Sequence, residues 1–235
     1  MTEEIDYQLF STPKPGWTRL GDNENTYVDQ EEAQYPSVSY QALATRYLNV
    51  LNLLEPGFNE HIKEDHICFG APGLSSLIEI LARALTRPKD SVCLLSPSFF
   101  LFKSAAKFND LNIIEVCLQG ESLNDFNYQE ILKSKSKLIF ICQPNNPIGS
   151  NINRDAILNL LENYAGFIFI DEAYQEFSDQ QSWAHYIHQY PNLIIGRTFS
   201  KALGLASIRI GALIAQPALL HCVKKLILPY AIAGP

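Results

Sequence analysis

A single lysine in a segment of small and hydroxyl-bearing residues is the first candidate for chemistry in this chain. Lys201 lies in the segment TFSKALGLASIR, after Thr198 and Ser200, and the chain enters that segment through the apolar run NLIIGRT. An amine beside apolar surface loses hydration, which disfavours its charged form, so we expect a lowered pKa for Lys201. A neutral amine is nucleophilic enough to form a Schiff base. A loop lysine that simply follows a core strand is the alternative, and this segment alone does not separate the two.

Other polar groups follow apolar runs that are typical of buried strands. Asp171 is the first polar residue after GFIFI and precedes Tyr174, and Asn146 follows KLIFIC. In parallel sheets, ligands bind beyond the carboxyl ends of the strands. A carboxylate at that place can hold a proton on a heterocyclic nitrogen, and an amide can donate a hydrogen bond to a ligand oxygen. The alternatives are a helix or turn cap for Asp171 and an ordinary Asn-Pro turn for Asn146.

A candidate phosphate site lies where a predicted strand meets a predicted helix. The segment GLSS at this junction contains Ser75 and Ser76. Backbone N–H groups at a helix start suit a phosphate, and serine hydroxyls add donors. Thr198, Ser200 and Arg209 could complete the site, because the arginine fork matches phosphate oxygens. The alternatives are serines that cap the helix and a surface ion pair for Arg209, which its position in an apolar run disfavours.

Phe99 adds a flat ring after the SPS that ends another apolar run, although a core phenylalanine would fit there as well. The candidates together are a lysine amine, a phosphate cradle, a carboxylate for a ring nitrogen and donors for a ring oxygen. These groups describe a pyridoxal-phosphate site. That cofactor is an electron sink whose ring nitrogen must stay protonated, which an aspartate partner ensures.

Short apolar runs alternate with helical patterns along the chain, which predicts βαβ units and an α/β fold. We expect a mostly parallel sheet covered by helices on both faces, that is, three αβα layers. Residues 1–40 are irregular and are predicted to be an N-terminal arm, whereas residues 41–235 are predicted to form the cofactor-binding domain. The predicted strands are 66–70, 91–95, 112–118, 137–142, 166–170, 193–197 and 208–215, and the predicted helices include 38–54, 99–108, 153–163 and 217–228.

Composition excludes several classes of protein. The chain has 235 residues, 47% of them hydrophobic, and a formal net charge of −7. Nucleic acids and anionic membranes select basic surfaces, so neither is expected as a partner. The five cysteines are scattered without a CxxC or Cys/His cluster, which predicts neither a disulfide framework nor a metal site. With no signal peptide or membrane span in view, we expect a cytoplasmic protein.

Three segments together resemble the class I and II aminotransferases of pyridoxal-phosphate fold type I. They are QPNNPIG, FIDEAYQEF and RTFSKALGLASIRIG. Within that family the closest likeness is to histidinol-phosphate aminotransferases, since NENTY and QYPS resemble their NENPY and RYP segments. The chain departs from the family pattern in the GLSS segment, which lacks the usual acidic residues, and in NENTY, which lacks the proline.

The resemblance implies roles for the residues that bind the cofactor ring. Lys201 would hold the cofactor as a Schiff base and later move a proton at the substrate's α-carbon. Asp171 would pair with the ring nitrogen. Tyr174 and Asn146 would hydrogen-bond the ring hydroxyl oxygen, and Phe99 would stack on the ring.

The resemblance also implies a phosphate site and a second subunit. Ser200 and Arg209 match phosphate ligands, with Ser75 and Ser76 in the loop and Thr198 as a further candidate. Tyr35 matches a tyrosine that reaches the phosphate from the neighbouring subunit, which implies a homodimer. Relatives continue into a smaller C-terminal domain with the arginine that binds the substrate's carboxylate or phosphate, and this domain is expected to be missing from the chain.

The function that the resemblance implies is amino-group transfer between two small molecules. Glutamate with 2-oxoglutarate is the expected donor pair, and the partner is a keto or phospho-keto compound, with histidinol phosphate favoured. One alternative is a decarboxylase of a phospho-amino acid such as threonine phosphate, which would use the same Lys201 and Asp171. Another alternative is a truncated cofactor-binding fragment without activity.

Overall fold

A seven-stranded sheet forms the centre of the computed structural model, which describes residue 36 and residues 40–233. The strand order is β1-β7-β6-β5-β4-β2-β3, and only β7 runs antiparallel to its neighbours. The mostly parallel sheet that the sequence predicts is therefore confirmed. The strands are β1 (Ile67–Gly70), β2 (Ser91–Ser96), β3 (Asn112–Cys117), β4 (Leu138–Cys142), β5 (Phe167–Asp171), β6 (Leu193–Thr198) and β7 (Gly211–Ile214).

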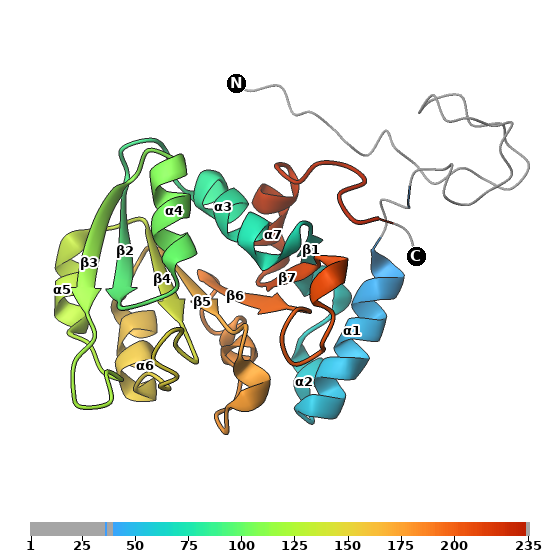
Figure 1. Ribbon diagram of the computed structural model, residues 1–235, viewed down its shortest axis with the longest axis horizontal. Coiled ribbons are helices and arrows are strands. Elements are labelled where there is room, and N and C mark those ends of the chain that lie inside the picture. The colour runs from blue at the N-terminus through green and yellow to red at the C-terminus, as the bar shows by residue number, and fades with distance from the viewer. Residues whose placement is uncertain (1–35, 37–39, 234–235) are drawn as a thin grey trace, which may run out of the picture.

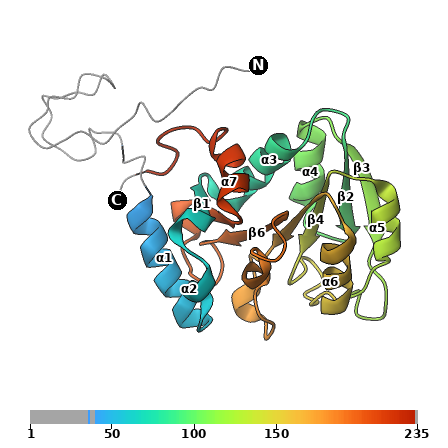
Figure 2. The ribbon, with the colours of Figure 1, turned by 180° about the vertical axis from the view of Figure 1, so that it is seen from behind.

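Helices cover both faces of the sheet, which confirms the three-layer αβα architecture (Figures 1 and 2). One face packs against α1 (Gln41–Leu54), α5 (Tyr128–Ser134) and α6 (Arg154–Asn163). The other face packs against α3 (Gly73–Leu85), α4 (Phe100–Phe108) and α7 (Pro217–Lys224). Because both faces are buried, the central strands β4, β5 and β6 begin with continuous apolar runs rather than alternating ones, and polar residues appear only at the ends of β5 and β6.

Several element bounds differ from those that the sequence predicts. The strand predicted over 166–170 extends to include Asp171, and the strand predicted over 208–215 begins only at Gly211. The helix predicted over 217–228 ends at Lys224. Helix α5 lies in a polar stretch for which the sequence analysis assigned no element, and the Asn127 side chain caps it by accepting a hydrogen bond from the Gln129 N–H at 3.1 Å.

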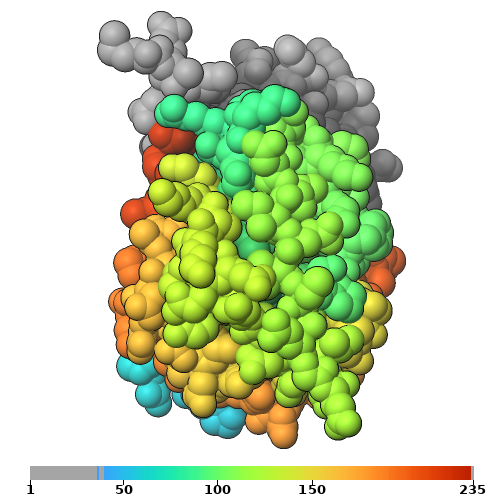
Figure 3. All heavy atoms as spheres, turned by 90° about the vertical axis from the view of Figure 1, so that its left-hand side faces the viewer, coloured from blue at the N-terminus to red at the C-terminus, as the bar shows by residue number. Residues whose placement is uncertain are grey.

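Short helical segments connect these elements. They are α2 (Phe58–His61), η3 (Glu64–His66), η4 (Gln175–Phe177), η5 (Trp183–Tyr186) and η6 (Ala206–Ile208). At one end of the sheet β3 forms an edge, and the segment that contains α4, β3 and α5 faces the viewer in green in Figure 3. No helix in residues 40–233 is long and apolar enough to cross a membrane. Almost all of the predicted arm, including Tyr35, lies outside the described residues.

The register of the central strands brings the candidate residues to one edge of the sheet. Cys142 at the end of β4 pairs with Asp171, and Asp171 pairs with Gly196 of β6. All three strands run in the same direction, so the segments that follow them leave the sheet at the same edge. The loop with Asn146, the turn with Tyr174 and the segment with Lys201 therefore begin side by side.

Candidate active site

Asp171 is the most deeply buried of the candidate residues. It is the last residue of β5 and is 3% exposed, and its Oδ1 accepts a hydrogen bond from the Ala173 N–H at 3.0 Å. Burial raises the pKa of this carboxyl to about 7, because the charged form loses its hydration. The Ala173 hydrogen bond and the charge of Lys201 act in the opposite direction, and the charge of Glu172 adds to the rise. The positive charge of Lys201 thus compensates only in part for the hydration that the Asp171 carboxylate loses on burial.

Lys201 follows the end of β6 and lies over the ring of Tyr174. Its Nζ is 5.3 Å from the centroid of that ring, within the range of a cation–π contact. Its charge also acts on Asp171. The apolar run before Lys201 predicts an amine desolvated by apolar surface, and this prediction of burial is wrong because Lys201 is exposed. The reason is that the chain leaves the buried strand at Thr198, so the lysine stands in the turn beyond it.

The candidates for contacts to a flat ring lie on the neighbouring strand ends. Tyr174 is half-buried at the start of η4, and Asn146 is half-buried after β4, where its backbone N–H contacts the Cys142 sulfur at 3.3 Å. Phe99 is half-buried directly before α4, and its ring makes edge contacts with Phe100 and Phe102. Phe99 therefore also packs in the manner of the core phenylalanine that was its alternative.

The start of α3 and the segment around Arg209 come together as a candidate anion site. The Arg209 carbonyl accepts a hydrogen bond from the Gly73 N–H at 2.7 Å, and a Cβ on Gly73 would lie 2.8 Å from the Arg209 guanidinium. The Arg209 Nη1 donates to the Ser200 hydroxyl at 3.3 Å. No side chain caps the first turn of α3. A thirteen-residue helix therefore presents N–H groups beside a guanidinium and a hydroxyl, which suits a phosphate.

Two glycines make this close arrangement possible. Gly73 has a φ of +81°, a conformation that side-chain-bearing residues rarely adopt. Gly211 at the start of β7 lets α3 approach closely, since a Cβ there would lie 2.3 Å from the Leu74 backbone nitrogen. The position of the GLSS segment therefore depends on close backbone contacts at Gly73 and Gly211, which the spacing of residues in the sequence does not reveal.

Other candidates for the phosphate site differ in exposure and hydrogen bonding from what the sequence predicts. Ser76 donates its hydroxyl to the Gly73 carbonyl at 2.9 Å within α3, so it acts in the helix's own first turn, while Ser75 is exposed. Arg209 was expected within an apolar strand. It instead lies before β7 in a left-handed conformation with a φ of 54°, exposed, and its Nη1 also donates to the Ala206 carbonyl at 2.9 Å. The Thr198 hydroxyl accepts from the Ser200 N–H at 3.2 Å.

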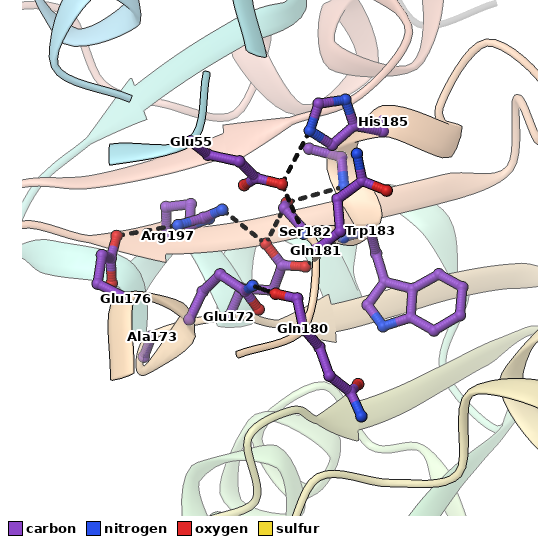
Figure 4. Close-up of polar contacts among 12 residues, drawn as sticks. Glu55, Glu172, Ala173, Glu176, Gln180, Gln181, Ser182, Trp183, His185 and Arg197 are labelled. Atoms are coloured by element: carbon purple, nitrogen blue, oxygen red, sulfur yellow. Dashed lines mark hydrogen bonds and ion pairs between the residues drawn. The ribbon is translucent and has the colours of Figure 1, made fainter. Parts of the chain in front are cut away.

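A buried ionic cluster behind the candidate site is a feature that the sequence analysis did not identify (Figure 4). Arg197 is 2% exposed and bridges Glu172 and Glu176, each at 2.9 Å. Burial raises the pKa of Glu172, and the charge of Arg197 opposes that rise. The signal in the sequence was an arginine inside the apolar run NLIIGRT, since a charge in a buried strand needs a partner.

Comparison with known sequences identifies a family. The model of the aminotransferase class I and II family matches residues 18–235. A histidinol-phosphate aminotransferase of Cytophaga hutchinsonii is 33% identical over 216 residues, which are 89% of this chain and 61% of that protein. One of Flavobacterium psychrophilum is 38% identical over 175 residues, 73% of this chain and 50% of that protein. The chain thus spans between half and two thirds of the length of these relatives.

Solved structures show the same arrangement of sheet and helices. The crystal structure of the histidinol-phosphate aminotransferase from Clostridium acetobutylicum matches with a TM-score of 0.70 and 26% identity, over 86% of this chain and 58% of that one. An L-threonine-O-3-phosphate decarboxylase from Porphyromonas gingivalis also matches with a TM-score of 0.70, at 21% identity over 86% of this chain and 60% of that one. At that identity the second likeness concerns the fold alone.

Proposed function

We propose that this chain, which belongs to the family of class I and II aminotransferases, binds pyridoxal 5'-phosphate and transfers an amino group between two small molecules. The observation that carries the proposal is the meeting of three groups at one edge of the sheet. Asp171 is a buried carboxyl whose pKa is raised by burial, and the charge of Lys201 opposes that rise. The Nζ of Lys201 lies 5.3 Å from the ring centroid of Tyr174. They are the groups that the cofactor's ring nitrogen and aldehyde require.

The described residues fit this cofactor in two respects. The Asp171 carboxyl is buried with a pKa raised to about 7, so a protonated ring nitrogen would supply the positive partner that it lacks. The uncapped first turn of α3 and the guanidinium of Arg209 offer a phosphate the donors that it needs. When bound, the cofactor supplies an electron sink for the bonds at the substrate's α-carbon.

Each residue then has a defined task. Lys201 would supply the amine that holds the cofactor and would move a proton at the substrate's α-carbon. Asp171 would keep the ring nitrogen protonated. Tyr174 and Asn146 would donate hydrogen bonds to the ring oxygen, and Phe99 would stack on the ring.

The phosphate would be held by the groups around the start of α3. Arg209 and Ser200 already contact each other at 3.3 Å, and the backbone of Ser75 and Ser76 belongs to the first turn of that helix. Thr198 orders this segment through its hydrogen bond from the Ser200 N–H.

We propose histidinol phosphate and glutamate as the two amino compounds of the reaction, so that histidinol phosphate gives up its amino group to become the corresponding ketone and 2-oxoglutarate takes that group up to become glutamate, or the reverse. The support is that relatives 33–38% identical to this chain carry the name histidinol-phosphate aminotransferase.

We further propose a cytoplasmic homodimer in which Tyr35 reaches the partner's phosphate site. The support for the dimer is the likeness of QYPS, which contains Tyr35, to the family segment whose tyrosine reaches the phosphate of the neighbouring subunit. The support for the compartment is that the described cysteines are free, as in reducing surroundings.

The direct test is to mix the chain with pyridoxal 5'-phosphate and follow the visible absorbance of a Schiff base. Borohydride should then fix one cofactor per chain, and peptide mass spectrometry should place it on Lys201. Lys201→Ala should give no adduct, whereas Lys133→Ala, which removes an exposed lysine of α5, should behave as the parent does. An adduct spread over several lysines would refute the assignment of Lys201.

Product analysis decides between the proposed reaction and its rival. Incubated with histidinol phosphate and 2-oxoglutarate, the loaded chain should form glutamate and release no gas. Carbon dioxide from threonine phosphate would instead indicate the decarboxylase. Cofactor binding without either product would indicate a fragment that binds but does not turn over.

A further inference from the structure

We propose that Arg197 is a positioning residue, which holds together the three segments that carry Asp171, Tyr174 and Lys201. The inference rests on the proposed function of those three residues. It concerns a side chain that touches neither cofactor nor substrate in that proposal, because Arg197 lies on the other face of the sheet.

Arg197 joins three segments of the chain through one guanidinium (Figure 4). Its Nη2 contacts the Glu172 carboxylate at 2.9 Å, and its Nη1 contacts the Glu176 carboxylate at 2.9 Å. Arg197 stands on β6, Glu172 follows the end of β5, and Glu176 lies in η4. The planar fork of arginine suits two carboxylates held at fixed positions better than the point charge of lysine does.

Each of these attachment points adjoins a candidate site residue. Glu172 directly follows Asp171, and Glu176 lies in the turn that begins at Tyr174. Arg197 precedes the end of β6, after which the chain continues to Lys201. A shift of any one attachment point would therefore move a site residue.

The sheet itself separates the cluster from the site. Successive residues of a strand point to opposite faces, so Glu172 and Asp171 project in opposite directions. The Glu172 N–H donates to the Gly196 carbonyl at 2.8 Å, which continues the β5–β6 pairing past Asp171. The Arg197–Glu172 ion pair thus fixes the backbone next to Asp171 from the opposite face of the sheet.

The glutamate at the centre of the cluster is itself held rigidly. Its Oε2 accepts from the Ser182 hydroxyl at 2.7 Å, and its Oε1 accepts from the Trp183 N–H at 2.6 Å. The Ser182 N–H in turn donates to Glu55 at 3.0 Å, and Glu55 contacts His185 at 2.9 Å. Elements on both sides, α1 and η5, therefore fix the carboxylate to which Arg197 is bound.

A stabilising role alone does not account for this arrangement. The net contribution of a buried ion pair to stability is small, because desolvation offsets the attraction between the charges. A pair of apolar side chains would fill the same space at a similar or lower cost. What an ionic cluster adds is a fixed mutual geometry of the three segments.

The test compares two variants with a matched control in the full chain. Arg197→Lys keeps the charge and removes the fork, whereas Glu176→Ala removes only the tether to η4. The control is Asp179→Ala, which removes an exposed acid that lines the same pocket of about 430 Å³ as Glu176 and Arg197. The readouts are the affinity for pyridoxal 5'-phosphate, the fraction of Lys201 fixed by borohydride, and hydrogen exchange measured without cofactor.

Both cluster variants should bind pyridoxal 5'-phosphate at least tenfold more weakly, with a matching fall in fixation on Lys201. Without cofactor, hydrogen exchange should rise in residues 171–177 and 198–205 and stay unchanged in β2, which is remote from the cluster. The control should differ from the parent less than twofold. All measurements are made well below the unfolding midpoint of each variant, so that lost stability does not enter.

Two results would overturn the inference, and they are distinguishable from failure of the proposed function. If the parent fixes cofactor on Lys201 and both variants do so with unchanged affinity, Arg197 positions nothing. If exchange rises equally in β2 and in residues 171–177, the arginine only stabilises the whole fold. A parent chain that fixes no cofactor would refute the proposed function, whereas the exchange pattern would still report on whether Arg197 holds these segments.

Discussion

The buried carboxyl of Asp171 ties the stability of the chain to pH. Its ordinary pKa of 3.8 is raised to about 7 by burial. Well below pH 3.8 the carboxyl is protonated whether the chain is folded or unfolded. Between pH 3.8 and about 7 the unfolded chain has released the proton while the folded chain still binds it, so the free energy of unfolding falls as the pH rises and levels off above 7. The shift corresponds to about 4 kcal/mol.

Asp171→Asn should remove this dependence. Asparagine can still accept the Ala173 hydrogen bond but cannot ionise. In urea unfolding without cofactor, the variant should gain stability over the parent progressively from pH 4.5 to 7, by up to about 4 kcal/mol. With cofactor bound, the same variant should lose most of its turnover, because the ring nitrogen loses its carboxylate.

The matched control for this prediction is Asp179→Asn, at an exposed aspartate. It makes the same change of side chain at an exposed carboxyl, so it isolates the part of the effect that comes from the burial of Asp171. A stability difference between Asp171→Asn and the parent that does not change with pH would show that Asp171 ionises normally in the folded chain.

The start of α3 depends on a residue without a side chain at its first position. Gly73→Ala would strain a backbone with a φ of +81° and bring a Cβ within 2.8 Å of the Arg209 guanidinium. We expect the variant to bind pyridoxal 5'-phosphate about tenfold more weakly, equivalent to about 1.4 kcal/mol. Its affinity for pyridoxal, which lacks the phosphate, should change little, and fluorescence titration measures both.

Gly120→Ala separates the anion site from the backbone strain. Gly120 has a φ of +82° but lies after β3, with only the Asn124 side chain near, at 3.6 Å. Both variants should lose roughly 1–2 kcal/mol of stability, and only Gly73→Ala should lose phosphate selectivity. Equal weakening for pyridoxal and its phosphate would argue against an anion site at this helix.

The whole molecule should become more stable when it binds its cofactor. A ligand that binds only the folded chain adds about 2.7 kcal/mol at a concentration one hundred times its Kd. For a chain of this size, that corresponds to a rise in the thermal midpoint of roughly 5–11 °C. Differential scanning fluorimetry against increasing pyridoxal 5'-phosphate measures the rise.

Pyridoxine 5'-phosphate is the control ligand, because it carries the phosphate and the ring but no aldehyde. It should shift the midpoint less at equal concentration, since it cannot form a Schiff base with Lys201. A midpoint that does not depend on the concentration of either ligand would contradict a site of this kind in the chain.

The amino-acid sequence by itself determined the fold class and the ends of the central strands. β4, β5 and β6 are buried on both faces, so each begins with an unbroken apolar run, and polar residues mark where the run ends. Asp171 directly ends the run of β5, and Asn146 and Lys201 follow a few residues beyond the runs of β4 and β6. The signal is local, because hydrophobic burial acts on contiguous residues and polar groups mark where burial ends.

The tertiary structure alone decided which side chains meet. β7 lies between β1 and β6, although β1 is the first strand of the chain, and this order places Arg209 against Gly73. It also decided that Lys201 is exposed and that Arg197 has two carboxylate partners. Such contacts join segments that are distant along the chain, and they depend on strand order and on backbone conformations such as the left-handed one at Arg209, which no local pattern of residue types encodes.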